Sequence, residues 1–86
     1  MSFAHYTHEM PPDFDETQYC TDLRAQVEAA IGRTADDWEV TNIRHHKADG
    51  VTTYHARVLS GEGIWVIVRW TRDADGNQTL LEALDH

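Results

Sequence analysis

The sequence contains only one cysteine, Cys20, in 86 residues, and this scarcity excludes two classes of small protein. A single cysteine cannot form a disulfide within the chain, so the fold is not a disulfide-stabilised scaffold. A structural zinc site built from several cysteines is excluded for the same reason. We therefore expect a reducing, cytoplasmic location.

Long hydrophobic runs are also missing. No stretch approaches the roughly 18–20 apolar residues that a membrane-spanning helix requires. The N-terminal residues 1–6 lack the positive flank and the apolar segment of a signal peptide. We expect no membrane partner.

The chain also has few basic residues. It contains 7 of them and 15 acidic residues, which gives a net charge of −8. A chain this acidic repels the phosphate backbone, so we expect no direct binding to nucleic acid. The excess of acid lies before the first predicted strand. Four of these acids belong to one predicted helix and are predicted to meet a basic surface on a protein partner: Asp15, Glu16, Asp22 and Glu28. The alternative is that the acidity serves solubility alone.

Motifs that carry catalysis are absent as well. The sequence has no phosphate-binding loop, dinucleotide-binding fingerprint, nucleophile elbow or zinc-protease helix. Cys20 falls on the apolar stripe of the predicted helix, which is typical of a buried, unreactive thiol. We predict no enzymatic activity and no cofactor.

The six histidines do not form a convincing metal site. His45 and His46 are adjacent, so in a strand they point to opposite faces and cannot both bind one ion. Asp73 and Asp75 resemble the start of a calcium loop, but Leu84 stands where the last, bidentate ligand should be. We predict no metal centre.

What the sequence does contain is an apolar, β-branched run, Ile64–Trp70, with glycines before it and an Asp-rich turn after it. A short run of this kind between turn signals predicts a central strand. Side chains alternate along a strand. Ile64, Val66, Val68 and Trp70 therefore form an apolar core row, whereas the row that starts at Trp65 is mixed.

A single helix is predicted over residues 15–31. Asp15 is the predicted N-cap, with Gln18 three residues later completing a capping box. One apolar stripe follows at helical spacing, and its members are Tyr19, Cys20, Leu23, Val27, Ala30 and Ile31. Gly32 comes directly after the stripe, where a left-handed helix cap favours glycine.

Three more strands are predicted, at residues 38–46, 52–60 and 78–84. The imperfect alternation of the first predicts a bulge near Asn42, and Asp49-Gly50 predicts a two-residue hairpin turn. A loop over residues 61–63 aligns the apolar rows, because it places Val58 opposite Val66. Residues 78–84 also have helix propensity, but the preceding turn favours a strand.

These elements predict an α+β fold of two layers, in which one N-terminal helix packs on a three- to four-stranded antiparallel meander. We divide the chain into an N-terminal arm, residues 1–14, and a single α+β domain, residues 15–86.

The mixed face of the sheet is the predicted partner-binding surface. Tryptophan and arginine around aliphatic residues is the composition that interface cores favour. The predicted binding residues of this face are Trp65, Ile67, Arg57, Arg69 and Arg44, and Val40, His46, His55 and Leu59 are expected beside them. The alternative is that the arm covers Trp65 and Ile67 through Phe3, Tyr6 or Met10.

Two functions are consistent with these features of the sequence. The first is a small, acidic, non-enzymatic interaction protein that acts by binding and occlusion, such as a phage-type inhibitor of a host nucleic-acid-handling complex; this comparison rests on size and charge alone. The second is a homodimer through the outer sheet face that binds a small ligand, or an enzyme accessory subunit with a pocket at that face.

Overall fold

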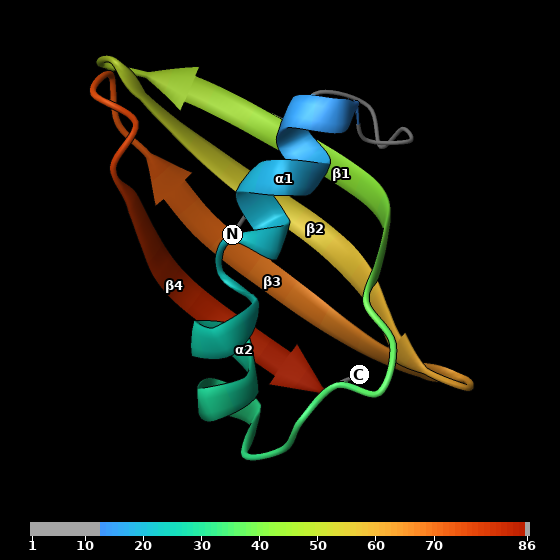
Figure 1. Ribbon diagram of the computed structural model, residues 1–86. Coiled ribbons are helices and arrows are strands. Elements are labelled where there is room, and N and C mark those ends of the chain that lie inside the picture. Colours follow the sequence, from blue (N-terminus) through green and yellow to red (C-terminus); the bar gives the residue numbers. More distant parts are fainter. Residues whose placement is uncertain (1–12, 86) are drawn as a thin grey trace.

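A computed structural model describes residues 13–85 of the chain, and its elements run α-α-β-β-β-β. The helices are α1 (Phe14–Thr21) and α2 (Arg24–Ile31). The strands are β1 (Glu39–Ala48), β2 (Val51–Gly61), β3 (Ile64–Arg72) and β4 (Gln78–Asp85). The predicted α+β class is confirmed, with the helices on the N-terminal side of the meander (Figure 1).

The predicted N-cap is wrong by two residues. Asp13 caps α1, because its carboxylate accepts a hydrogen bond from the Glu16 backbone N–H at 2.8 Å and the Glu16 side chain accepts one from the Asp13 backbone N–H. This is a capping box of the predicted type, formed by a different pair. The helix therefore begins within the segment assigned to the arm, and residues 1–12 lie outside the described residues.

The single predicted helix is in fact two, separated at Asp22 and Leu23. The Thr21 hydroxyl donates to the Thr17 carbonyl, a local bond that competes with regular helical geometry. The Leu23 N–H then bonds the Cys20 carbonyl three residues back, which tightens the last turn of α1. The chain changes direction there and resumes as α2, which ends at the left-handed Gly32 as predicted.

The four strands form one antiparallel sheet in the order β1-β2-β3-β4. Asp49 and Gly50 both have positive φ, 55° and 78°, as a two-residue hairpin turn of the predicted kind requires. Val58 lies opposite Val66, which confirms the register deduced from the apolar rows. The preference for a strand at the C-terminal end is also confirmed.

Each ladder of the sheet contains one register shift. The shift in β1 falls between Val40 and Asn42, where a bulge was predicted. A second falls between Leu59 and Gly61, and a third skips Leu81 in β4. Because an extra residue reverses the alternation of side chains, Val40 lies on the core side opposite Val58, and its placement on the outer face was wrong.

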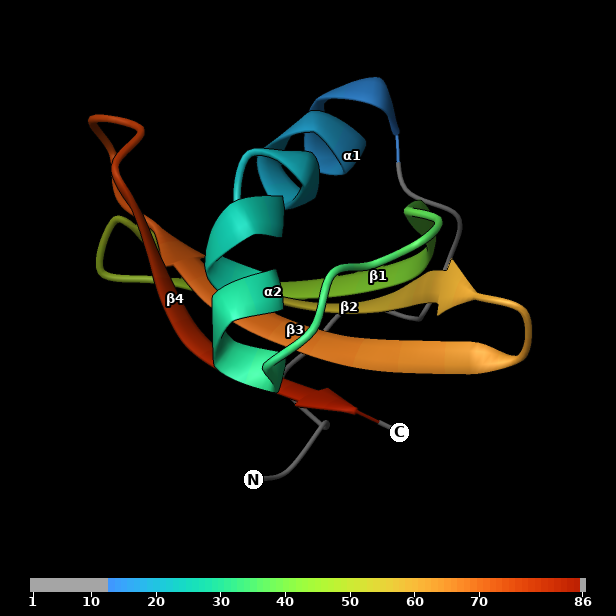
Figure 2. The same ribbon diagram turned by 60° about the horizontal axis from the view of Figure 1, so that its bottom comes forward.

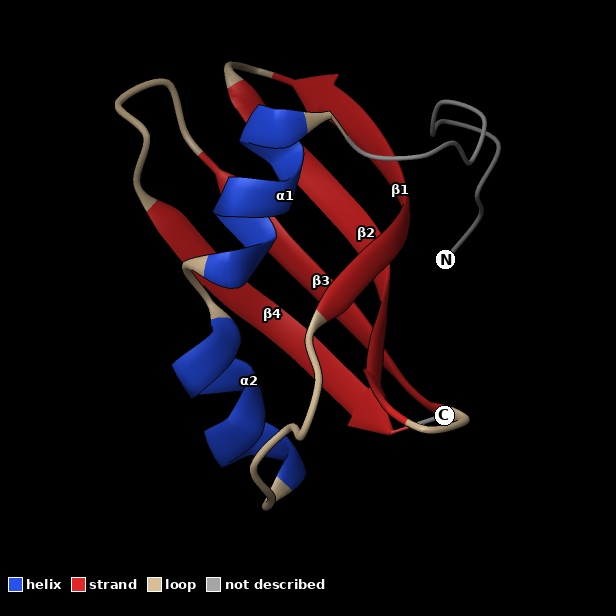
Figure 3. Cartoon of the chain, turned by 45° about the vertical axis from the view of Figure 1, so that its right-hand side comes forward, coloured by secondary structure: helices blue, strands red, loops and turns tan. Residues whose placement is uncertain are grey.

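Both helices lie on one face of the sheet, and Figure 2 shows them above the four strands. In Figure 3, α1 lies over the part of the sheet nearer β1, and α2 follows β4. Leu23 and Val27 are buried with Val66 and Val68 in one core cluster, as expected. Ala30 is exposed, contrary to the predicted stripe.

Aromatic rings extend this core toward α1. The rings of Tyr54 and Trp70 stack with their centroids 4.9 Å apart, and Tyr19 meets Tyr54 edge-on. The Trp70 indole N–H donates to the Gln78 side chain, so the buried ring has a polar partner. Over residues 13–85, no helix has the length and apolar content needed to cross a membrane.

Candidate protein-binding surface

The sheet face opposite the helices is here named the outer sheet face. Strand pairing arranges its side chains in four rows that cross the strands. From the β2–β3 turn towards the β1–β2 turn, the rows are Glu39–Leu59–Trp65; Asn42–Arg57–Ile67–Leu84; Arg44–His55–Arg69–Glu82; and His46–Thr53–Thr71–Thr79. All five residues predicted to bind a partner through this face, three arginines with Trp65 and Ile67, are thus brought together.

The first two rows form an apolar band of Leu59, Trp65, Ile67 and Leu84. Leu59, Trp65 and Ile67 are intermediate in exposure, and Leu84 is 51% exposed. The sequence-based prediction missed Leu84, because strict alternation along β4 does not show which side it faces. The bulge at Leu81 decides this by setting Leu84 opposite Ile67.

The second and third rows form a cationic band of Arg44, Arg57 and Arg69. The Arg57 guanidinium lies over the Trp65 ring, with its carbon 4.7 Å from the ring centroid, so the two bands are in direct contact. The Arg69 side chain forms an ion pair with Glu82 of β4, 3.7 Å from Nε to Oε2. Among the described residues, Glu39 and Glu82 are the acids in these four rows.

The four acids predicted to meet a basic partner occupy the opposite layer. Asp15 and Asp22 are exposed, and Asp22 accepts a hydrogen bond from Gln18. Glu16 belongs to the capping box and lies 3.6 Å from His45 of β1. Glu28 accepts the backbone N–H of Ala35 at 2.8 Å. Glu16 and Glu28 therefore make contacts within the fold. Of the four predicted acids, Asp15 and Asp22 are the exposed ones.

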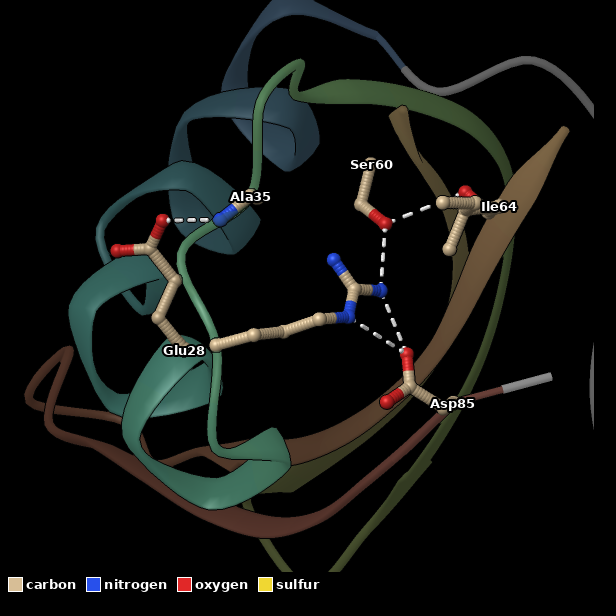
Figure 4. Close-up of polar contacts among 6 residues, drawn as sticks. Glu28, Ala35, Ser60, Ile64 and Asp85 are labelled. Carbon is tan, nitrogen blue, oxygen red and sulfur yellow. Dashed lines mark hydrogen bonds and ion pairs between the residues drawn. The ribbon is translucent and has the colours of Figure 1, made fainter. Parts of the chain in front are cut away.

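A polar cluster at the end of α2 fixes the position of β4, and Figure 4 shows it beside the Glu28–Ala35 bond. Arg33 donates to the Asp85 carboxylate of β4 and, at 3.0 Å, to the Ser60 hydroxyl of β2. Ser60 is 1% exposed and donates in turn to the Ile64 carbonyl. Arg33 thus connects the helix layer to β2 and β4. Its bond to Asp85 stabilises the end of β4, next to Leu84 of the apolar band.

Two further groups that the sequence singles out, Cys20 and Asp73, have structural surroundings. Cys20 is fully buried, and this burial raises the pKa of its thiol to about 12, so the group stays protonated and unreactive near neutral pH. Backbone N–H groups of Asn77 and Asp75 donate to the Asp73 carboxylate; the bond from Asn77 contributes most to lowering the pKa of Asp73. These hydrogen bonds from the backbone to an aspartate side chain are typical of a turn.

The adjacent histidines of β1 point to opposite faces of the sheet, as predicted. His45 pairs with Tyr54 on the helix side, and its neighbour His46 pairs with Thr53 on the outer sheet face. Within residues 13–85, no group of three or more histidine, cysteine or carboxylate side chains is placed to hold a metal ion.

Comparison with known proteins yielded no relative from which a function could be transferred: no protein-family model matches the sequence, and no curated protein matches it significantly.

Proposed function

We propose that this chain is a non-enzymatic interaction protein that binds a protein partner with its outer sheet face and acts by occluding the bound surface. One observation carries the proposal: the apolar band and three arginines share the sheet face opposite both helices, and Arg57 of this set contacts Trp65. Tryptophan and arginine are among the residues that contribute most to binding at protein interfaces.

Energetics support the same assignment. Burying a large apolar side chain fully contributes about 1.5–3 kcal/mol, and Leu84, at 51% exposed, retains much of that potential. Trp65 is held by Arg57 from the neighbouring strand, so a partner meets a side chain that is already oriented. Preorganised side chains lose little conformational entropy on binding. An inhibitor of a nucleic-acid-handling complex remains one form of this function, proposed on size and charge.

Site-specific photo-crosslinking in the source cell tests the proposal. A photoreactive phenylalanine at Leu84 is expected to capture a protein partner, and the same residue at Ala29, exposed on α2, is the matched control. The captured protein is then purified, and sedimentation measures its binding to the wild-type chain and to Trp65→Ala. We expect Trp65→Ala to weaken binding at least tenfold while the thermal midpoint of the free chain changes little.

Three results would contradict the proposal. Equal capture from Ala29 would move the interface to the helix layer. Unchanged affinity of Trp65→Ala would remove the apolar band from it. A crosslink from Leu84 to residues 3–10 of the same chain, with Trp65→Ala leaving partner binding intact, would assign the face to an internal contact.

A further inference from the structure

We infer that the open edge of β4, beneath α2, binds an extended segment of a protein partner as a fifth strand of the sheet. The bound segment carries apolar side chains at alternate positions. This inference goes beyond the proposed function, because it concerns a second surface, formed by the edge of a strand and the flank of a helix.

β4 lies at one edge of the sheet that residues 13–85 form, and its strand partner there is β3. Alternate residues of an antiparallel strand direct their backbone N–H and C=O groups away from the neighbouring strand. β4 therefore offers a row of donors and acceptors on its other side. An extended peptide satisfies such an edge through main-chain hydrogen bonds.

The two edge strands differ in how they are protected. β1 carries exposed charges near both ends, at Glu39 and Lys47, and charged side chains discourage pairing at an edge. β4 has no lysine or proline, and its two carboxylates form ion pairs with Arg69 and Arg33. Leu81, in the bulge of β4, is 47% exposed. β4 is therefore the edge that favours an added strand.

Hydrogen bonds on both sides of α2 hold this helix along β4. Before the helix, the Gln78 side-chain amide donates to the Tyr19 carbonyl at 3.0 Å, and after it Arg33 donates to Asp85. Figure 1 and Figure 3 both show α2 over β4, on the side away from β3. A strand added at this edge would thus lie beneath the helix.

The flank of α2 beyond β4 carries Ala30. Val27 of this helix faces the core. Because successive residues are about 100° apart around a helix, Glu28 and Ala30 lie on opposite flanks. Glu28 and, one turn earlier, Arg24 bond to Ala35, in the segment that leads to β1. Ala30 therefore lies on the flank that faces the open edge, and it is exposed.

Apolar side chains between α2 and β4 are incompletely covered. Ile31, Leu80 and Ala83 pack against the core but are only partly buried, and their chain neighbours Ala30 and Leu81 are exposed. An added strand with an apolar side chain at every second position would cover this set, because side chains alternate along a strand. A second copy of this chain suits the site less well, since two α2 helices would meet over the paired edges and each chain carries −8.

Selection from a phage-displayed library of random twelve-residue peptides tests the inference on the full chain. Enriched peptides are expected to have apolar residues at alternate positions. A synthetic copy of one is then N-methylated at one peptide bond at a time, which removes a single N–H donor. We expect affinity to fall about tenfold at every second position, because only alternate N–H groups of an added strand face β4.

Ala30→Glu is expected to weaken binding of the same peptide about tenfold, because it places a carboxylate over the added strand. Ala29→Glu is the matched control, since Ala29 is exposed on the same helix, turned away from the sheet, and it should bind as the wild type does. Circular dichroism and the thermal midpoint establish that each variant folds. Leu81→Lys, which puts a charge at the edge itself, replaces Ala30→Glu if that variant does not fold. Trp65→Ala should bind the peptide normally, which separates this test from that of the proposed function.

The inference is overturned if no peptide is enriched, if N-methylation shows no period of two, or if Ala30→Glu binds no more weakly than Ala29→Glu. Self-association of the wild-type chain that Leu81→Lys abolishes would also overturn it, because a second copy would then be the occupant. A photoreactive phenylalanine at Leu81 that crosslinks to residues 1–12 of the same chain would likewise reject it, by assigning the edge to an internal contact.

Discussion

Single residues in this protein often combine two structural roles, and Leu23 is the clearest case. It lies at the break between α1 and α2, where its carbonyl accepts the N–H of Val27 and starts the second helix. Its side chain is only 2% exposed and belongs to the core cluster. The hydrophobic pattern predicts the burial of Leu23, but it does not predict that the helix is interrupted there.

Leu23→Ala is therefore expected to lower the free energy of unfolding by about 2–4 kcal/mol, because burial is lost and a cavity remains. Urea denaturation followed by tryptophan fluorescence measures the change. Gln26→Ala, on the exposed side of α2, is the control and should stay close to the wild type. A Leu23→Ala midpoint indistinguishable from that of the control would show that Leu23 is not a core residue.

The acids show why charge alone is a poor guide at the residue scale. In the sequence, Asp15, Glu16, Asp22 and Glu28 are equivalent candidates. In the fold, Glu16 and Glu28 each accept a backbone N–H, whereas Asp15 and Asp22 remain exposed. The distinction depends on where the helix begins and on how the segment at Ala35 returns to α2.

At the scale of elements, α1 is capped by Asp13, two residues before the predicted cap Asp15. Asp13→Ala is expected to lower the free energy of unfolding by about 1 kcal/mol, because the backbone N–H of Glu16 loses its acceptor. Asp15→Ala, in the exposed first turn, should cost only a few tenths of that. Thermal or urea denaturation of the two variants compares them directly, and the opposite order would restore Asp15 as the cap.

The strands were easier to predict than the helices, because turn residues and apolar rows specify them together. Asp49-Gly50 is a residue pair typical of a two-residue hairpin turn, and it joins β1 to β2. Pairing Val58 with Val66 then specifies the register between β2 and β3. Bulges are harder to predict. The bulge near Asn42 interrupts the alternation of apolar and polar residues, so it can be seen in the sequence. The shift at Leu81 cannot, because either leucine of the Leu80-Leu81 pair could face the core. The outer position of Leu84 was missed for that reason.

At the scale of the whole molecule, the two layers differ in charge, and the helix layer carries the acidic excess. Reversing both exposed helix acids, in Asp15→Lys with Asp22→Lys, is expected to leave the thermal midpoint nearly unchanged, because neither carboxylate is buried. If this layer meets a basic partner, the double variant should weaken association, and the wild-type affinity should fall with salt.

Surface plasmon resonance at two salt concentrations, with the partner identified by crosslinking, makes this measurement. The outer-face variant Trp65→Ala, measured beside it, shows which layer the partner contacts. Unchanged affinity of the double variant would assign the acidity of the helices to solubility alone.

The overall architecture was predictable because each local signal agrees with one two-layer arrangement. The composition of the outer sheet face was also largely predictable, since period-two alternation assigns Trp65, Ile67, Arg57 and Arg69 to one side. The identity of the proposed partner was not, because it depends on the chemistry of a second molecule.

The extra residue in β4 has a consequence for how this protein tolerates changes in length. In a regular strand, loss of one residue turns every later side chain to the opposite face. Leu81 already stands outside the ladder, so its deletion would join Leu80 to Glu82 without turning Ala83 outward or Leu84 inward. A homologue one residue shorter at this point could therefore keep the same core and the same outer sheet face, whereas a deletion at Thr79 would disturb the pairing of the strand.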